Sequence, residues 1–239
     1  MNPLVFVHGF MGGSAQWARQ APLAQGREIV ALDLPGFGLR AGQPALASIA
    51  DYGAWVLAEL SRLGHAQFDL LGHSMGGMIA QEVVRQGPAR VGRLILYGTG
   101  PVGVLPGRFE PIDTSIARAQ ADGPQATARR ISATWFLHGE AAADYPACAK
   151  VAECAGLGAQ VAGLRAMQGW NGQAALPLIA QPTLLIWGDQ DRTYPWAQVQ
   201  ALWQGIANSQ LAVVPGCAHA VHMEWPDLFN QIVAGFLAR

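Results

Sequence analysis

Short, unbroken runs of aliphatic and β-branched residues recur along the chain, and helix-like stretches separate them. Continuous rather than alternating apolar runs are typical of strands that are covered on both faces. Strands that alternate with helices favour a parallel sheet with right-handed crossovers. The sequence therefore predicts an α/β fold, a mostly parallel sheet with helices on both faces. The expected strands are residues 4–7, 29–32, 68–71, 94–97, 183–187 and 211–214, and the expected core helices are residues 49–63, 77–85, 197–206 and 228–237.

One long region interrupts this alternation. Residues 101–178 contain no strand-like run, but they hold Ala-rich stretches with helical periodicity at residues 115–121, 124–137, 146–155 and 160–168. A compact domain seldom carries so long a connection without a functional reason. We therefore expect a core made of residues 1–100 and 179–239 and a helical cap, or lid, made of residues 101–178. An ordinary set of long connections is the alternative.

The composition excludes several classes of protein. Of the 239 residues, 51% are hydrophobic and 13% are charged, which excludes a disordered chain. The net charge is −1 and the basic residues are scattered, so the sequence gives no indication of a basic surface that would bind nucleic acid. No apolar window reaches the roughly 18 residues of a membrane-spanning helix, and no basic segment precedes the first apolar run, so we expect a cytoplasmic protein. The three cysteines and six histidines show no ligand spacing, so we expect no metal and no cofactor. The oligomeric state is not indicated.

The sequence Gly-His-Ser-Met-Gly at residues 72–76 carries the first chemical signal. An apolar run precedes it and a helical stretch follows it. A serine at such a sharp strand-to-helix turn projects its hydroxyl out of the fold, at the cost of a strained backbone. The N-terminus of the following helix favours negative charge that develops beside it. The pattern therefore indicates Ser74 as a nucleophile.

Two further polar residues follow later strands. Asp191 follows the run at 183–187, and His219 follows the run at 211–214. Reacting groups in open parallel sheets gather at the carboxyl ends of the strands. The order serine, acid, histidine matches a hydrolase triad in which the histidine takes the serine proton and the acid orients the histidine. Asp189 is the alternative acid, and His222, expected at the start of the next helix, is the alternative base.

Five segments together resemble the α/β-hydrolase superfamily, in its serine-nucleophile branch, over nearly the whole chain. This resemblance implies that Ser74 is the nucleophile, Asp191 the acid and His219 the base. It also implies an oxyanion hole formed by the backbone N–H groups of Phe10 and Met75. The matching segments are residues 8–10, 33–38, 72–77, 188–191 and 219–226.

The chain departs from the family pattern in three places. There is no room for both of the strands that usually precede the His-Gly segment. Ala218 stands where the family has a glycine, and Leu39 stands where it often has a serine. None of these changes removes a catalytic group, although Leu39 is expected to alter the mouth of the site. His8 and Asp33 are expected to organise loops rather than to carry protons.

The expected cap contributes aromatic and basic residues. Trp135, Phe136 and Trp170 are the candidates for an apolar substrate pocket. Four arginines of this region offer guanidinium groups that bind carboxylates in a bidentate manner, although we expect them to be solvated surface charges. They are Arg108, Arg118, Arg129 and Arg130.

These features together predict a serine hydrolase that cleaves a small ester or lactone through an acyl-serine intermediate, with a small molecule as its partner. The Trp135–Phe136 pair and the segment Thr99-Gly100-Pro101 after its strand are similar to 3-oxoadipate enol-lactonases, and the chain also resembles small carboxylesterases. The same triad also serves C–C bond hydrolases of meta-cleavage products and lyases of the menaquinone-pathway type, so both stay open as alternatives. A non-enzymatic ligand receptor is disfavoured, because a receptor has no need of a base-activated serine. The sequence leaves the substrate, its acyl length and any lid motion open.

Overall fold

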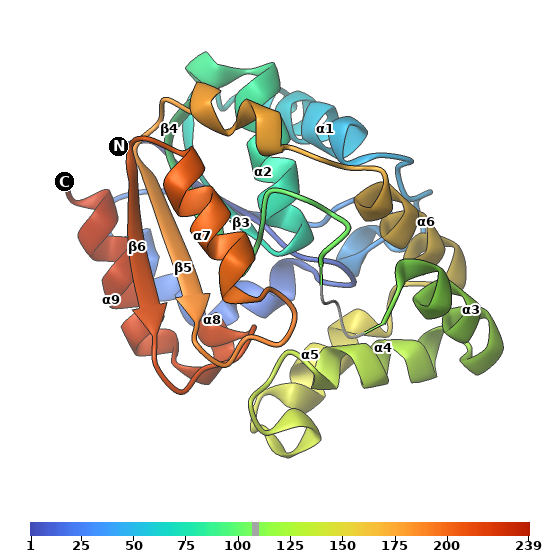
Figure 1. Cartoon of the computed structure of the whole chain (residues 1–239). Helices are drawn as coiled ribbons and strands as arrows, with labels where there is room; N and C mark the ends of the chain where they lie inside the picture. Colours follow the sequence, from blue (N-terminus) through green and yellow to red (C-terminus); the bar gives the residue numbers. More distant parts are fainter. Residues whose placement is uncertain (107–109) are drawn as a thin grey trace.

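Within the described residues, six strands form one sheet in which every pairing is parallel, with the strand order β2-β1-β3-β4-β5-β6. The structure is a computed structural model and describes residues 1–106 and 110–239 (Figure 1). The predicted fold class is confirmed, and each strand includes the run expected for it. The strands are β1 (Leu4–Val7), β2 (Ile29–Leu32), β3 (Phe68–His73), β4 (Val91–Tyr97), β5 (Thr183–Gly188) and β6 (Ser209–Val214).

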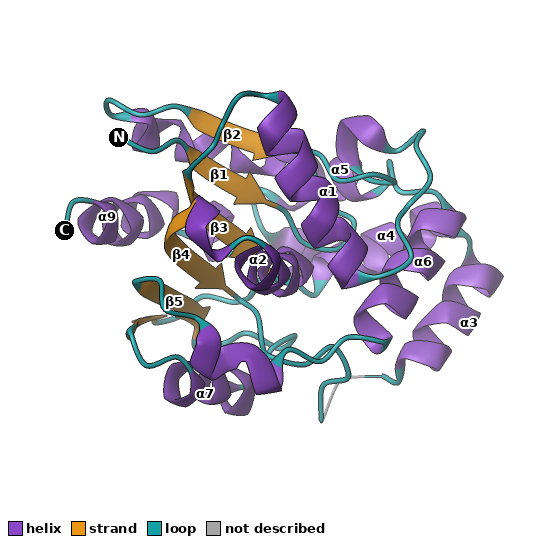
Figure 2. Ribbon diagram, turned by 90° about the horizontal axis from the view of Figure 1, so that it is seen from above, coloured by secondary structure: helices purple, strands orange, loops and turns teal. Residues whose placement is uncertain are grey.

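The two faces of the sheet are covered by different helices (Figure 2). Side chains alternate along each strand, so Val5 and Val7 join one buried cluster, whereas Leu4 and Phe6 join another. The first cluster includes apolar residues of α1 (Ile49–Arg62), α2 (Met75–Gln86) and α7 (Trp196–Gly205). The second includes residues of the 3-10 helix η1 (Ser14–Ala24) and of α9 (Pro226–Leu237). Burial on both faces explains why the strands are apolar throughout.

In the described part of the segment between β4 and β5, four α-helices gather to one side of the sheet in Figure 1. Their apolar residues belong to the same buried cluster as α1 and α2, so this segment packs directly on the core. An antiparallel bridge between Val102 and Asn171 joins the two ends of the segment. That it acts as a lid stays a prediction. The helices are α3 (Ile112–Asp122), α4 (Pro124–Ala133), α5 (Tyr145–Ala152) and α6 (Leu157–Gln168).

Two helical features differ from the sequence-based expectation. The helix expected over residues 124–137 ends at Ala133, because Thr134 and Trp135 turn the chain with backbone bonds to Ile131 and Ser132. The 11-residue η1 was not expected, since a 3-10 helix lacks the period of 3.6 residues. The remaining short helices are η2 (Gly38–Arg40), η3 (Pro88–Arg90), η4 (Gly139–Ala141), η5 (Gln173–Leu178) and α8 (Val221–Glu224).

None of the helices in the described part of the chain combines the length and the apolar character that crossing a membrane would require.

Candidate active site

Ser74 occupies a strained turn between β3 and α2. Its backbone has φ 56° and ψ −120°, and among the described residues only Met11 and Ser74 are non-glycine residues with positive φ. The turn is held from both sides, because the Ser74 N–H donates to the Tyr97 carbonyl (3.0 Å) and the Ser74 carbonyl accepts from the Thr99 hydroxyl (2.8 Å). Strain of this kind persists only where the surroundings enforce it, and it is concentrated at functional sites.

Two glycines make this turn possible by allowing close backbone contacts. A Cβ on Gly72 would lie 2.2 Å from the carbonyl oxygen of Gly76. A Cβ on Gly76 would lie 2.2 Å from the carbonyl oxygen of Val7, on the neighbouring strand β1. Any larger residue would therefore push α2 away from the sheet and displace Ser74, so the Gly-x-Ser-x-Gly pattern has a steric origin here.

Asp191 and His219 meet at the carboxyl ends of β5 and β6. The His219 Nδ1 atom lies 2.8 Å from Asp191 Oδ2, and the two side chains are 1% and 0% exposed. The other carboxylate oxygen of Asp191 accepts the backbone N–H groups of Thr193 (2.7 Å) and Tyr194 (3.1 Å). Such a fully bonded carboxylate holds the imidazole in one orientation, with its Nδ1 protonated and its Nε2 free to accept a proton.

The base candidate lies close to the strained turn. The His219 ring is 4.5 Å, between ring centroids, from the ring of His73, which directly precedes Ser74. The Tyr194 ring stacks on His219 at 5.7 Å. The structure thus brings the segments of the three triad candidates together at one end of the sheet.

The alternative acid and base occupy other positions. Asp189 is exposed and accepts the backbone N–H of Gly216 at 2.7 Å, which links the loops after β5 and β6. His222 lies in α8, as expected for the start of the next helix, but it is buried rather than at the surface. Its Nδ1 contacts the hydroxyl of Tyr97 at 3.1 Å rather than a carboxylate. Neither residue has the partners of an acid–base pair among the residues that the structure describes.

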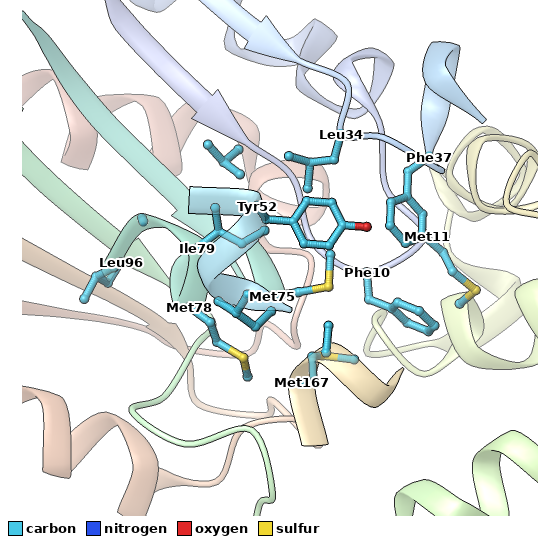
Figure 3. Close-up of a cluster of buried hydrophobic side chains, with 14 of the residues drawn as sticks. Phe10, Met11, Leu34, Phe37, Tyr52, Met75, Met78, Ile79, Leu96 and Met167 are labelled. Atoms are coloured by element: carbon cyan, nitrogen blue, oxygen red, sulfur yellow. The ribbon is translucent and has the colours of Figure 1, made fainter. Parts of the chain in front are cut away.

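The two oxyanion candidates lie beside Ser74. Met75 begins α2, so its N–H is among the first four of the helix, which have no acceptor inside the helix. Phe10 lies in the loop after β1, and its side chain and Ser74 line the same cavity. The side chains of Phe10, Met75 and Met167 lie near one another in the buried cluster of Figure 3. The backbone N–H groups of Phe10 and Met75 therefore belong to residues whose side chains are packed in the buried core.

His8 and Asp33 organise these loops, as the sequence analysis predicts. The His8 Nδ1 donates to the Gly9 carbonyl (2.7 Å), and the His8 Nε2 accepts the N–H of Leu34 (3.0 Å). Both ring nitrogens are thus used by a neutral imidazole, and burial lowers the pKa of His8 to about 4. The Asp33 carboxylate accepts the backbone N–H and the hydroxyl of Ser14 and the N–H of Leu39.

A small cavity of about 50 Å³ opens at Ser74. Most of its wall comes from the segment between β4 and β5, and in the described part of the chain no Asp, Glu, His, Lys or Arg side chain lines it. Trp135 lies on this wall, as predicted. Leu39, expected at the mouth, is 90% exposed and is not part of the wall. The lining residues are Phe10, Ser74, Gly103, Leu105, Ile112, Ile131, Thr134, Trp135, Met167, Thr193 and Tyr194.

The predicted pocket role of Phe136 and Trp170 needs correction. Trp170 turns toward α2, where its indole N–H donates to Glu82 at 3.0 Å, and it lines a separate cavity of about 210 Å³. Phe136 packs edge-on against Tyr145 at 6.3 Å, because the chain has already left α4 at this point. Sequence position placed both residues in the right segment but did not show which way each side chain turns.

Three of the four arginines singled out in this segment pair with carboxylates of the same segment. Arg118 and Arg130 pair with Glu110 at 3.2 and 3.3 Å, and Arg129 pairs with Glu153. None of these three lines the cavity at Ser74. Arg108 lies outside the described residues. In the described ranges, residues 1–106 and 110–239, no group of three or more His, Cys, Asp or Glu side chains could hold a metal ion.

Tyr97, Thr99 and Tyr194 contact the triad candidates, but the sequence did not indicate such a role for any of them. Tyr97 and Thr99 hold the backbone of Ser74, and Tyr194 stacks on His219. Tyr97 was expected only as the last residue of a buried strand. Its polar hydroxyl in an otherwise aliphatic run was the one signal that could have identified it.

Comparison with known proteins agrees with this fold. The profile described as "Alpha/beta hydrolase family" matches residues 4–232. A relative from Escherichia coli (strain K12), 2-hydroxy-6-oxononadienedioate/2-hydroxy-6-oxononatrienedioate hydrolase, is 30% identical over 252 residues, which cover 99% of this chain and 87% of the relative. The enol-lactonase from Burkholderia xenovorans LB400 matches with a TM-score of 0.88 and 22% identity, over 100% of this chain and 92% of that one. A thermophilic esterase from Thermogutta terrifontis matches with a TM-score of 0.89 and 24% identity, over 100% and 90%. The chain therefore belongs to the α/β hydrolase family.

Proposed function

We propose that this protein hydrolyses a small, uncharged ester or lactone through an acyl-serine intermediate. Ser74 is the nucleophile, His219 the general base and acid, and Asp191 the residue that orients His219. The observation that carries the proposal is the buried Asp191–His219 contact of 2.8 Å, at the same end of the sheet as the strained serine. A lone serine hydroxyl is a weak nucleophile, and such a pair is what activates it.

The reaction proceeds in two halves. The Ser74 oxygen attacks the carbonyl carbon while His219 Nε2 takes the hydroxyl proton, and the carbonyl π electrons move to the oxygen. The tetrahedral intermediate then expels the alcohol oxygen, which takes the proton from His219. Water repeats the sequence on the acyl-serine and releases the acid. Throughout, the Asp191 carboxylate stabilises the imidazolium of His219. Because both side chains are almost fully buried, the electrostatic attraction between them is stronger than it would be in water.

The developing oxyanion is stabilised by the backbone N–H groups of Phe10 and Met75. Each such donor contributes about 3–4 kcal/mol to transition-state stabilisation in other hydrolases. The position of Met75 at the first turn of α2 supports its part in this role. The turn that contains Gly9 and Gly12, which are joined by a backbone bond of 3.0 Å, supports the placement of the Phe10 N–H.

The cavity wall supports the substrate class. A small space lined mostly by apolar residues, with Ser74, Tyr194 and two threonines as its polar members, suits a short acyl or lactone ring. A substrate carboxylate would lose its hydration there without gaining a cationic partner among the described residues, which is costly. We further propose that residues 101–178 act as a cap, because seven of the lining residues belong to this segment, namely Gly103, Leu105, Ile112, Ile131, Thr134, Trp135 and Met167.

C–C bond hydrolysis is the second candidate. It is favoured by the 30% identity to the Escherichia coli enzyme, whose name describes a hydrolase of dienedioates and trienedioates. The name of that substrate implies two carboxylates, and the lack of a cationic side chain on the described cavity wall weighs against a substrate of this kind. The two candidates share the triad and differ in the bond that is cleaved.

The test compares substrates as well as variants. Purified protein should release p-nitrophenol from p-nitrophenyl acetate, and Ser74→Ala should remove nearly all of this activity. Equal rates in the two proteins would contradict the proposal. A 2-hydroxy-6-oxo-dienoate should be cleaved far more slowly than the ester, whereas a kcat/KM higher by orders of magnitude on the dienoate would establish the second candidate.

A further inference from the structure

Two side-chain donors converge on the main-chain carbonyl of the candidate base. The Tyr97 hydroxyl lies 2.6 Å from the carbonyl oxygen of His219, and His73 Nε2 lies 3.2 Å from the same oxygen. A carbonyl oxygen has two lone pairs and only accepts, so both contacts donate a proton to it. The main-chain carbonyl of Tyr97 accepts the N–H of Ser74 at 3.0 Å. Tyr97 thus holds the main chain of both the nucleophile and the base.

We propose that Tyr97 is a positioning residue for the reaction. It fixes the distance between the turn of Ser74 and the loop of His219, so that the imidazole of His219 stays in line between Asp191 and the serine. This inference rests on the proposed function, since it assigns Tyr97 a role through the triad. Tyr97 is suited to the task because it ends the central strand β4 and is fully buried.

The hydrogen bonds of this cluster determine which atoms of Tyr97, His222 and His73 carry a proton. Tyr97 has one hydroxyl proton, and the His219 carbonyl takes it. The hydroxyl oxygen must therefore accept from His222, whose Nδ1 lies at 3.1 Å and whose backbone N–H lies at 3.3 Å. His222 consequently carries its proton on Nδ1, and His73 carries its proton on Nε2. Tyr97 sets the tautomer of one neighbouring histidine while it holds the backbone of another.

The two neighbouring histidines, His73 and His222, are kept neutral. The ring of His73 lies 4.5 Å from that of His219 and 5.3 Å from that of His222, between centroids. Burial, with smaller contributions from the neighbouring histidines, holds the pKa of His73 well below its ordinary value and lowers that of His222 to about 3. The positive charge that forms during the reaction is thus confined to His219, which faces Asp191. Among the described residues, the other titratable groups around this cluster are His8, Tyr194, Cys217 and Glu224.

The first test is Tyr97→Phe, which removes the hydroxyl and keeps the ring. The ring contacts of Tyr97 with His73 (4.4 Å) and Phe229 (5.1 Å) are retained. We expect kcat on p-nitrophenyl acetate to fall about 10- to 100-fold, because small misplacements of a catalytic group have effects of this size, while KM stays within about twofold. The matched control is Tyr52→Phe, which removes another fully buried hydroxyl that bonds a main-chain carbonyl, that of Pro35 at 3.1 Å.

The control separates positioning from stability. Tyr52→Phe should lower the free energy of unfolding by a similar amount and leave kcat unchanged. If Tyr97→Phe keeps the kcat of the wild type, or if both variants lose kcat in proportion to their loss of stability, the inference is overturned. Activity that survives in Ser74→Ala would instead overturn the proposed function, so the two failures are distinguishable.

A second test needs no variant. Nitrogen-15 chemical shifts of the histidine rings in the wild-type protein report tautomer and charge. We expect His222 to be protonated on Nδ1 and His73 on Nε2, and both to stay neutral from pH 8 to pH 5. The opposite tautomer at His222, or a titration of either ring near pH 6.5, would overturn the inference even if Tyr97→Phe does not fold.

Discussion

The backbone N–H of Ala220, the residue after the candidate base, donates to the carbonyl oxygen of Trp135 at 2.9 Å. This bond joins the loop of His219 to the wall of the cavity at Ser74. The indole of Trp135 also lies 6.4 Å from the His219 ring, between centroids. The segment that shapes the cavity is therefore fixed directly to the loop that carries the proposed chemistry.

Trp135 is predicted to limit the length of the acyl group. Trp135→Ala should enlarge the cavity and shift the preference among p-nitrophenyl esters from acetate toward longer chains. Each methylene that gains an apolar contact should raise kcat/KM by about fourfold, the equivalent of about 0.8 kcal/mol. Trp170→Phe is the control, because Trp170 lies outside this cavity and should leave the chain-length profile as it is. A shift produced by Trp170→Phe rather than by Trp135→Ala would contradict this assignment.

Asp191 is predicted to be the acid that orients the base. Asp191→Asn should lower kcat by about 10³- to 10⁴-fold, because the amide favours the wrong tautomer of His219. The paired variant Asp189→Asn changes an exposed residue whose carboxylate accepts only the Gly216 N–H among the described contacts. It should retain most of the activity. The test is a measurement of the steady-state kcat of both variants. A larger loss of kcat in Asp189→Asn than in Asp191→Asn would identify Asp189 as the acid.

Stability is predicted to fall between pH 6.5 and pH 5. Burial lowers the pKa of His8 to about 4 and of His222 to about 3, so the native state stays neutral where the unfolded chain takes up protons. Because the unfolded state then binds more protons, the free energy of unfolding decreases with falling pH, by about 2 kcal/mol per histidine over this window. Urea denaturation at pH 7.5 and pH 5 measures the change. His8→Asn should show a smaller pH dependence, and equal stability at both pH values would contradict the prediction.

The close contacts around the serine turn are predicted to make Gly72 intolerant of substitution. Gly72→Ala would place a Cβ 2.2 Å from the carbonyl oxygen of Gly76 and should lower the free energy of unfolding by at least about 1–3 kcal/mol, the usual cost of overpacking. Gly158→Ala, in α6 with open space around its Cβ, should instead raise it by about 0.5–1 kcal/mol. Chemical denaturation distinguishes the two, and equal stabilities would show that the turn relaxes freely.

The sheet was predictable because parallel strands that are buried on both faces consist of unbroken runs of apolar residues. Leu4–Val7 and Ile29–Leu32 agree with the expected bounds, and the other strands extend the expected runs by one to three residues at an end. Ser74, Asp191 and His219 could be proposed from the sequence for a related reason, since each follows such a run and parallel topology brings strand ends together.

Other features depend on information that local sequence does not carry. Trp170 and Trp135 belong to the same segment, yet one turns toward Glu82 and the other toward the cavity, and this choice is made by tertiary packing. The partner of the Tyr97 hydroxyl lies 122 positions away, at His219. The 3-10 helix Ser14–Ala24 lacks the α-helical period, so its burial of Trp17 and Leu23 against the sheet was not expected.

The central claim, that His219 activates Ser74 as a nucleophile, is tested most directly by covalent labelling. The protein is incubated with diethyl p-nitrophenyl phosphate, and its intact mass and peptide map are measured. We predict the addition of one diethylphosphoryl group per chain, located on Ser74, with little labelling in His219→Ala. A protein that stays unlabelled, or that is labelled at another residue, or an adduct on Ser74 that forms equally fast in His219→Ala, would contradict the account.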